Sequence, residues 1–252
     1  MMGREIPRER VIEELDELLS RNDYEAAREH LLFWLSEAES AGDNGGILLL
    51  CNELMGLCRK LGERERALFY AKSALGQIEK MGIEENTGAA TTYLNSATVY
   101  KAFSMAADAL PLFEKAKAIY DCNLPPDDER HAGLYNNMAL SLVDLGHFSE
   151  ADELYKRALA VLRLNFGKEP EQAVTYLNMA SAAEAERGLL DAAEQIASLC
   201  EKAMELLDSC QNAGDGNYAF VCEKCASTFG YYGYFDYERQ LKERARRIYE
   251  GA

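Results

Sequence analysis

Proline is scarce in this sequence, with 5 among 252 residues. Because proline interrupts helix interiors, its scarcity removes the main obstacle to long helices, and abundant Ala, Leu, Glu and Lys favour them. Long apolar runs are also missing: even the longest, such as Ile47 to Cys51, fall far short of the ~20 residues that span a bilayer. The first ten residues contain no apolar segment typical of a secretion signal. We therefore expect a helical, cytoplasmic protein.

Positive charge is in deficit as well. The chain has 27 Lys and Arg against 43 Asp and Glu, which gives a formal net charge of −16 at pH 7. Nucleic-acid binding depends on cationic side chains that displace counterions from phosphates, and anionic membranes also attract cations. The composition therefore argues against nucleic acid and membranes as partners. The seven cysteines are odd in number and scattered, which fits reduced thiols better than disulfides.

Groups with catalytic chemistry are sparse. His30, His131 and His147 lie far apart in the sequence, and none has a Cys or carboxylate at a catalytic or ligand spacing. A glycine-rich loop of the kind that cradles phosphates is absent. We therefore expect no enzyme, no catalytic residue and no cofactor.

What the sequence does contain is a repeat. The pattern Tyr-x-Asn-x-Ala begins at Tyr93, Tyr135 and Tyr176, with spacings of 42 and 41 residues, and a weaker copy begins at Cys51. In each copy, apolar residues recur at steps of three and four on both sides of a short turn. This periodicity predicts two helices per repeat, each with one buried stripe.

Small residues hold fixed positions in each repeat. Turns are predicted at Gly62 and Gly146, because glycine adopts left-handed conformations easily, and at Asn22 in a divergent first copy. Alanine occupies the positions where the two helices of a hairpin should approach most closely, since a larger side chain would keep the backbones apart. These alanines are Ala67, Ala97, Ala109, Ala139 and Ala151.

The repeat extends to both ends of the chain in degenerate form, as expected for terminal units of a repeat array. Val11 and Leu15 continue it upstream, and Tyr218 continues it downstream. The sequence therefore predicts an all-α solenoid of tandem helical hairpins forming one domain over residues 1–252. The predicted hairpins span about 8–41, 48–81, 90–123, 132–165, 173–206 and 215–250.

The pattern Gly-x-Phe-x-x-Ala-x-x-x-Tyr-x-x-Ala, from Gly146 to Ala158, resembles the tetratricopeptide repeat (TPR), whose usual unit is ~34 residues. The longer unit here, with a connector at Gly167 to Pro170, is similar to the repeats of kinesin light chains. This resemblance implies an α-α superhelix in which the first helix of each hairpin lines a concave groove. It also implies a scaffold that binds an extended peptide or a helix of a protein partner.

Three repeats place asparagine at one position of the first helix. The family uses such amides to hydrogen-bond the backbone of a bound peptide, since an amide both donates and accepts; the alternative is that they only bridge adjacent hairpins. Two basic residues on these helices, Arg59 and Lys101, could bind a carboxylate or be ordinary solvated charges. Three leucines, Leu94, Leu140 and Leu177, could anchor a partner or be covered by the chain itself. The candidate peptide-binding residues are Asn52, Asn95, Asn136, Asn137, Asn178, Arg59, Lys101, Leu94, Leu140 and Leu177.

The segment from Phe229 to Tyr237 is unusually rich in aromatic residues. We expect it to pack inside the last hairpin; the alternative is a contact with a partner or a second copy. A self-associating structural or regulatory module with a closed groove is therefore the alternative to a binding scaffold, and a homo-oligomer is possible.

Two cysteines near the C-terminus have a spacing that metal sites also use. Cys222 and Cys225, with Cys200 and Cys210, could supply four zinc ligands. In the repeat, however, the first pair falls on small and apolar positions of a helix. Because a free thiol packs as a small apolar group, we expect core packing and no metal.

Overall fold

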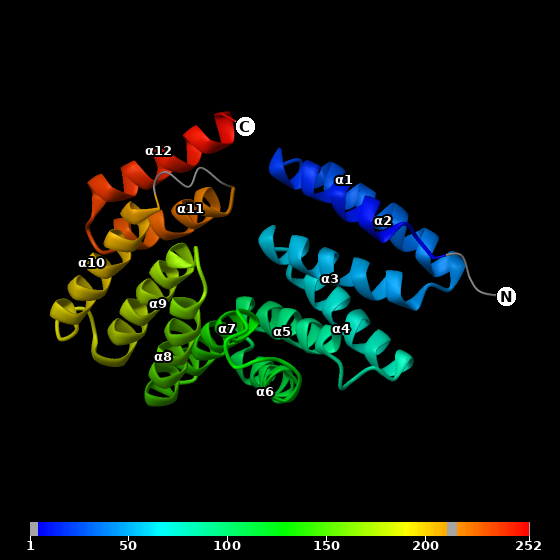
Figure 1. Cartoon of the computed structure of the whole chain (residues 1–252), viewed down its shortest axis with the longest axis horizontal. Coiled ribbons are helices and arrows are strands. Elements are labelled where there is room, and N and C mark those ends of the chain that lie inside the picture. Colours follow the sequence, from blue (N-terminus) through cyan, green and yellow to red (C-terminus); the bar gives the residue numbers. More distant parts are fainter. Residues whose placement is uncertain (1–4, 211–215, 252) are drawn as a thin grey trace. The chain divides into compact units, whose positions relative to one another are not determined.

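The computed structural model describes residues 5–210 and 216–251, and these residues contain twelve α-helices and no strand (Figure 1). The helices are α1 (Arg8–Ser20), α2 (Tyr24–Ala41), α3 (Asn44–Lys60), α4 (Arg64–Met81), α5 (Thr87–Ala102), α6 (Ala106–Asn123), α7 (Arg130–Asp144), α8 (Phe148–Leu164), α9 (Glu169–Arg187), α10 (Ala193–Ser209), α11 (Gly216–Tyr231) and α12 (Phe235–Gly251).

Consecutive helices pack in pairs, from α1 with α2 to α11 with α12. We call the first helix of each pair an A helix and the second a B helix. This arrangement confirms the predicted all-α array of tandem hairpins. Contacts divide the chain into two compact units, unit 1 (Met1–Leu124) and unit 2 (Pro125–Ala252), each with three helix pairs. The assignment of residues 1–252 to a single domain stays a prediction.

The predicted turns adopt the backbone conformation that their residues favour. Gly62 and Gly146 have φ values of 73° and 79°, and Asn22 has φ of 56°. Asparagine is among the few other residues that enter this left-handed region readily. Ser104, with φ of 62°, takes the same conformation between α5 and α6. The hairpin turn therefore keeps its geometry even where another residue replaces glycine.

The alanines at the predicted helix-crossing positions are buried. Ala97 and Ala109, on α5 and α6, are completely buried, as are Ala139 and Ala151 on α7 and α8. Around them, larger side chains such as Phe113 fill the space between helices. The prediction that these alanines lie inside the hairpins is confirmed.

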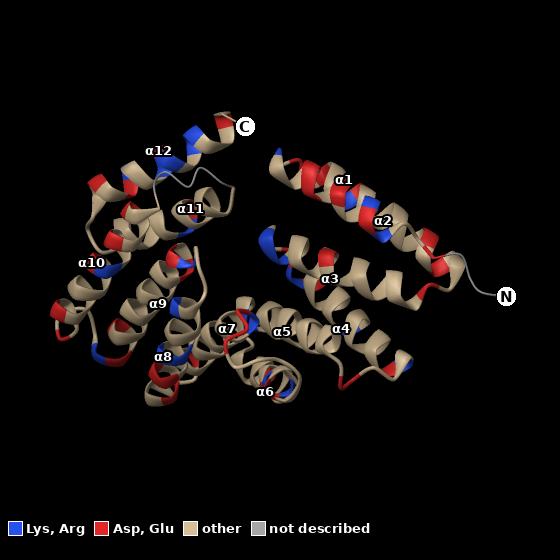
Figure 2. Cartoon of the chain, viewed as in Figure 1, with Lys and Arg blue, Asp and Glu red and all other residues tan. Residues whose placement is uncertain are grey.

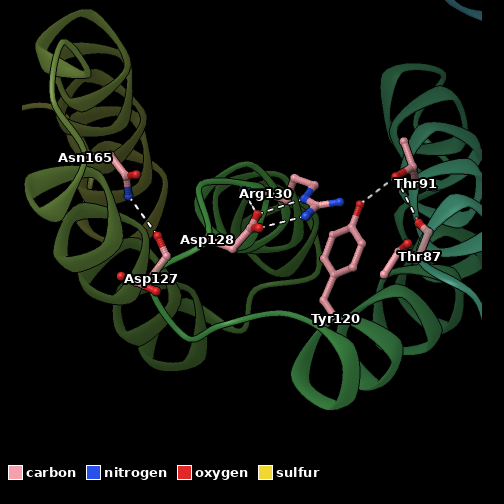
Figure 3. A network of polar contacts seen from close by, with 7 residues as sticks. All are labelled: Thr87, Thr91, Tyr120, Asp127, Asp128, Arg130 and Asn165. Carbon is pink, nitrogen blue, oxygen red and sulfur yellow. Dashed lines mark hydrogen bonds and ion pairs between the residues drawn. The ribbon is translucent and has the colours of Figure 1, made fainter.

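Helix α5 has the fewest charged residues of the helices in unit 1. It carries a single charged residue, Lys101, and is almost entirely tan in Figure 2, whereas α12 carries both signs of charge along its length. Helix α5 packs against α3, α4 and α6, so few of its side chains can be charged. A polar contact secures its first turns: the Tyr120 hydroxyl lies 2.9 Å from Thr91 Oγ1, which donates to the Thr87 carbonyl (Figure 3).

Two helices of unit 1 begin earlier than the predicted hairpins. Helices α3 and α5 start at Asn44 and Thr87, rather than near residues 48 and 90. The side chains of Asp43 and Asn86 accept hydrogen bonds from backbone N–H groups in the first turns. These N-caps satisfy donors that a helix otherwise leaves unpaired, and they extend both helices beyond their apolar periodicity.

Asp43 also holds the segment that precedes α1 and the first residue of that helix. Its carboxylate accepts hydrogen bonds from the N–H groups of Ile6 and Gly46 and from Arg8 Nη2, at 3.1, 2.9 and 2.8 Å. Burial raises the pKa of Asp43, but the hydrogen bonds from Gly46, Ile6 and Arg8 outweigh it and hold that pKa below its usual 3.8. The charged form is therefore stabilised by folding.

Asp43→Ala is expected to lower the free energy of unfolding by about 2 kcal/mol at neutral pH. Since folding depresses the pKa of Asp43, its contribution is complete above pH 3.8 and is lost as the pH falls through the folded-state value. Urea unfolding of the unsubstituted chain and of Asp43→Ala at pH 6 and pH 3 should show a smaller difference in the free energy of unfolding at the lower pH. Asp23→Ala is the control, because Asp23 caps only Ala26 and is exposed. An equal difference at both pH values would contradict the linkage.

Candidate functional site

The predicted asparagines form bridges between neighbouring A helices. In unit 1, Asn95 Nδ2 on α5 donates to Asn52 Oδ1 on α3 at 3.1 Å, and Asn52 Nδ2 donates to Thr92 Oγ1 at 3.0 Å. In unit 2, Asn178 Nδ2 on α9 donates to Asn136 Oδ1 on α7 at 3.0 Å. The bridging alternative is thus realised in this structure for these four amides.

The bridges do not use the full hydrogen-bonding capacity of the asparagine side chains. Among the described residues, Asn136 Nδ2 and Asn178 Oδ1 make no hydrogen bond, and Asn137 makes none through either atom. All three side chains are only half-buried, so a ligand could reach them. Peptide contact by these asparagines stays a prediction, and Asn137 is the amide with the most capacity to make it.

The other predicted site residues differ in accessibility. Arg59 is exposed on α3, and Lys101 is half-buried at the equivalent position of α5. Leu94 and Leu140 are half-buried. Leu177 departs from its predicted groove position: it is only 3% exposed and belongs to the core that α9 shares with α10, α11 and α12. Leu177 therefore supports the hairpin and offers no surface to a partner.

Unit 2 contains a cleft of about 360 Å³ among its three A helices, which we call the α7–α9–α11 cleft. Residues of α7, α9 and α11 line it, together with Leu162 of α8 and with Glu129 and Lys168, which directly precede α7 and α9. Its lining residues are Glu129, Arg130, Ala132, Gly133, Asn136, Asn137, Leu162, Lys168, Glu171, Val174, Thr175, Asn217, Phe220, Val221 and Lys224. Two predicted residues, Asn136 and Asn137, are therefore brought together in one concave site.

Ion pairs fix two cations at the rim of the cleft. Lys168 Nζ lies 2.6 Å from Glu129 Oε2, and the hydrogen bond to Glu129 is the main cause of the raised pKa of Lys168. Arg130 donates to both carboxylate oxygens of Asp128 at 2.8 and 2.7 Å (Figure 3). The hydrogen bonds from Arg130 lower the pKa of Asp128 to about 2. Both pairs are formed within the chain, so each cation already has an anionic partner.

The segment before α7 is held against the end of α8. Asn165 Nδ2 donates to the carbonyl of Asp127 at 2.9 Å and to the carbonyl of Val161 at 3.0 Å (Figure 3). The Asn165 amide therefore links the end of α8 to the segment that precedes α7. This contact fixes the backbone that presents Glu129 and Arg130 to the cleft.

Helix α11 contributes residues that the sequence analysis did not select. Phe220 is 49% exposed and lines the cleft together with Asn217 and Lys224. Phe220 lies 42 residues after Asn178, so it occupies the asparagine position of the last repeat. Aligning the divergent repeat residue by residue, rather than treating it only as a terminal unit, would have revealed this aromatic substitution.

The cysteines near the C-terminus pack in the core of unit 2. Cys222 and Cys225 are buried on α11, and Cys200 is buried on α10. Burial raises the pKa of Cys225 to about 12, which keeps its thiol protonated, the reverse of an activated or metal-bound cysteine. In residues 5–210 and 216–251, His, Cys, Asp and Glu form no group of three or more suited to a metal.

The geometry defines a fold class: tandem helix pairs in which consecutive helices pack together, as in TPR-like repeat solenoids. Solved structures of such repeats share the fold of this chain. No family profile matches its sequence, and no curated protein matches it either. Within the described part of the chain, no helix has the length and hydropathy needed to cross a membrane.

Particular structures show this likeness. BtubC (BKLC) from P. vanneervenii matches with a TM-score of 0.67 and 19% identity, over 80% of this chain and 80% of that chain. The nearly identical TPR-like repeats of a putative kinesin light chain from Podosopora anserina match with a TM-score of 0.51 and 18% identity, over 80% of this chain and 94% of that chain. A substituted form of the same repeats gives a TM-score of 0.55 at 18% identity, over 80% of this chain and 93% of that chain.

Proposed function

We propose that this chain is a protein–protein interaction scaffold that holds an extended segment of a partner protein in the α7–α9–α11 cleft. The observation that carries the proposal is the cleft itself, in which half-buried amides lie beside apolar surface. Binding sites commonly combine an apolar lining with a few polar groups that fix orientation. TPR-like repeat folds serve in general as scaffolds for protein partners, which agrees with this use.

The cleft offers both kinds of contact that an extended peptide needs. Asn137 can donate to a peptide carbonyl and accept from a peptide N–H, so it can bind backbone without demanding a sequence. Val174 and Phe220 supply the apolar surface for a side chain of the partner. A protein segment uses both, whereas the net charge of −16 disfavours nucleic acid and anionic membranes. The proposal includes a cytoplasmic site of action and no catalytic step or cofactor.

The double variant Asn137→Ala, Phe220→Ala is expected to weaken partner binding by roughly 30- to 1,000-fold, because a hydrogen bond and an aromatic contact contribute about 1–2 kcal/mol each and about 1.4 kcal/mol is tenfold. Partners captured from the native cell by the full chain should be quantified by mass spectrometry, and their affinities measured by interferometry. Leu190→Ala is the matched control, since Leu190 is highly exposed in the α9–α10 loop and does not line the cleft. Equal capture and affinity with the double variant would refute the proposal.

The alternative function, a self-associating module, has one observation in its favour. Tyr231 and Phe235 are 67% and 69% exposed where α11 meets α12, and aromatic side chains are enriched at protein interfaces. Light scattering of the purified chain separates the two functions. A stable dimer that dissociates in the variant Tyr231→Ala, Phe235→Ala would favour self-association, and a monomer favours the scaffold.

A further inference from the structure

One carboxylate oxygen in the α7–α9–α11 cleft lacks a hydrogen-bond partner. Glu171, on the first turn of α9, accepts a hydrogen bond at Oε1 from Asn217 Nδ2 at 3.2 Å. Its other oxygen, Oε2, is buried and has no donor among the described residues. A buried acceptor without a partner is costly, and more so when it carries charge. A donor supplied by a ligand would remove this cost.

The position of Glu171 makes that oxygen available to a ligand. Glu171 lines the cleft, and the terminal torsion of a glutamate side chain has broad, shallow energy wells. A turn of the carboxylate therefore directs an oxygen into the cleft without moving α9. The hydrogen bond from Asn217, at 3.2 Å, is at the long end for N–H···O bonds and resists such a turn only weakly.

Charge favours a cationic donor over a neutral one. Lys168 and Arg130 are paired with Glu129 and Asp128 inside the chain. The charge of Glu171 also acts on Lys168, but neither cation donates a hydrogen bond to Glu171 Oε2. The chain as a whole carries a formal charge of −16. A field of that sign raises the encounter rate with basic segments and lowers it with acidic ones.

The aromatic ring in the cleft selects among cations. Phe220 lies on α11 three residues after Asn217, so the two side chains are neighbours on one helix face. Half of Phe220 is exposed, with the cleft on one side. A guanidinium stacks on an aromatic ring and binds a carboxylate through two parallel hydrogen bonds, which a lysine ammonium does not do.

We infer that the α7–α9–α11 cleft recognises an arginine side chain in the partner segment, with its guanidinium bonded to Glu171 and stacked on Phe220. This inference rests on the proposed function and names the chemistry of the partner. The rival is an acidic side chain bound by Lys224, which also lines the cleft. The two differ in the sign of charge that the cleft prefers.

Three labelled peptides of one frame test the inference: Gly-Ser-Val-Xaa-Val-Ser-Gly, in which Xaa is arginine, its neutral isostere citrulline, or glutamate. Fluorescence anisotropy with the full chain is expected to show about tenfold tighter binding of the arginine peptide than of the citrulline peptide. Glu171→Gln should abolish that preference, and Lys224→Gln should preserve it. Circular dichroism of each variant checks that the fold is retained.

Several outcomes would overturn the inference. They are a preference for the glutamate peptide, an arginine preference that survives Glu171→Gln, and the failure of all three peptides to bind at millimolar concentration. If any of these occurs while partner capture still depends on Asn137 and Phe220, the scaffold function stands and only the arginine specificity fails. If capture is independent of both residues, the proposed function itself fails.

Discussion

Phe229→Ala is expected to destabilise the last hairpin of unit 2 by about 4 kcal/mol. The side chain is completely buried on α11, and its ring packs edge-on against Tyr237 and Tyr234, with centroids 4.9 and 6.0 Å apart. Removing a buried aromatic ring costs about 3–5 kcal/mol, through lost transfer free energy and the cavity that remains, and paired rings add to it. This would be the largest effect of any substitution considered for this chain.

Phe235→Ala is the matched control, because Phe235 lies in the same aromatic segment but is 69% exposed. Its effect should stay within about 0.5 kcal/mol. Urea unfolding followed by circular dichroism gives the free energies, and amide hydrogen exchange locates the loss. In a repeat array the destabilisation should be largest in α11 and α12 and their neighbours. Similar losses in both variants would mean that the aromatic segment is not packed as described.

Arg244→Ala is expected to cost about 2 kcal/mol. Arg244, on α12, donates to Asp208 Oδ1 at 2.7 Å and to the Tyr218 hydroxyl at 3.1 Å, and its guanidinium lies 5.5 Å from the centre of the Tyr237 ring. Tyr237 also donates to Asp208 Oδ1, at 2.9 Å. One side chain thus links α12 to α10 and α11. Because Asp208 is half exposed, water recovers part of the lost interaction, which keeps the cost moderate.

Arg246→Ala removes an equal charge from the same helix and serves as the control. Arg246 pairs only with Glu243 and Glu250 of α12 and is 60% exposed, so its loss should cost less than about 0.5 kcal/mol. Thermal unfolding, measured with both variants under identical conditions, should therefore separate them clearly. Equal unfolding temperatures would show that the contacts of Arg244 do not hold α12 in place.

The repeat explains why the sequence predicted the helix pairs and their turns. A hairpin buries its apolar stripes only if small residues recur where its helices cross, as Ala97 and Ala109 do, and if the turn tolerates a left-handed residue, as at Gly146. Both requirements concern residues within one hairpin, so they can be recognised in the amino-acid sequence. The capping side chains Asp43 and Asn86 were equally local, but they lie outside the apolar periodicity that set the predicted boundaries.

The candidate site was less predictable because it depends on distances between different repeats. Whether Asn178 meets a partner or Asn136 is decided by the spacing of α7 and α9, which no single repeat specifies. The burial of Leu177 likewise depends on how α9 packs against neighbouring helices. Phe220 escaped notice because the last repeat departs from the asparagine pattern. The periodicity thus predicted the helices but not which side chains from different repeats meet at the surface.

The amide bridges between A helices have a thermodynamic consequence. The hydrogen with which Asn178 reaches Asn136 cannot be given to a ligand at the same time, and Asn136 lines the cleft. A ligand that competes for Asn136 Oδ1 therefore loosens the link between α7 and α9, while one that uses only the vacant Asn136 amide hydrogens keeps it. A ligand at Asn136 Oδ1 and the Asn178–Asn136 hydrogen bond therefore oppose each other in unit 2. By thermodynamic reciprocity, the factor by which the ligand weakens this hydrogen bond is the factor by which the hydrogen bond weakens ligand binding.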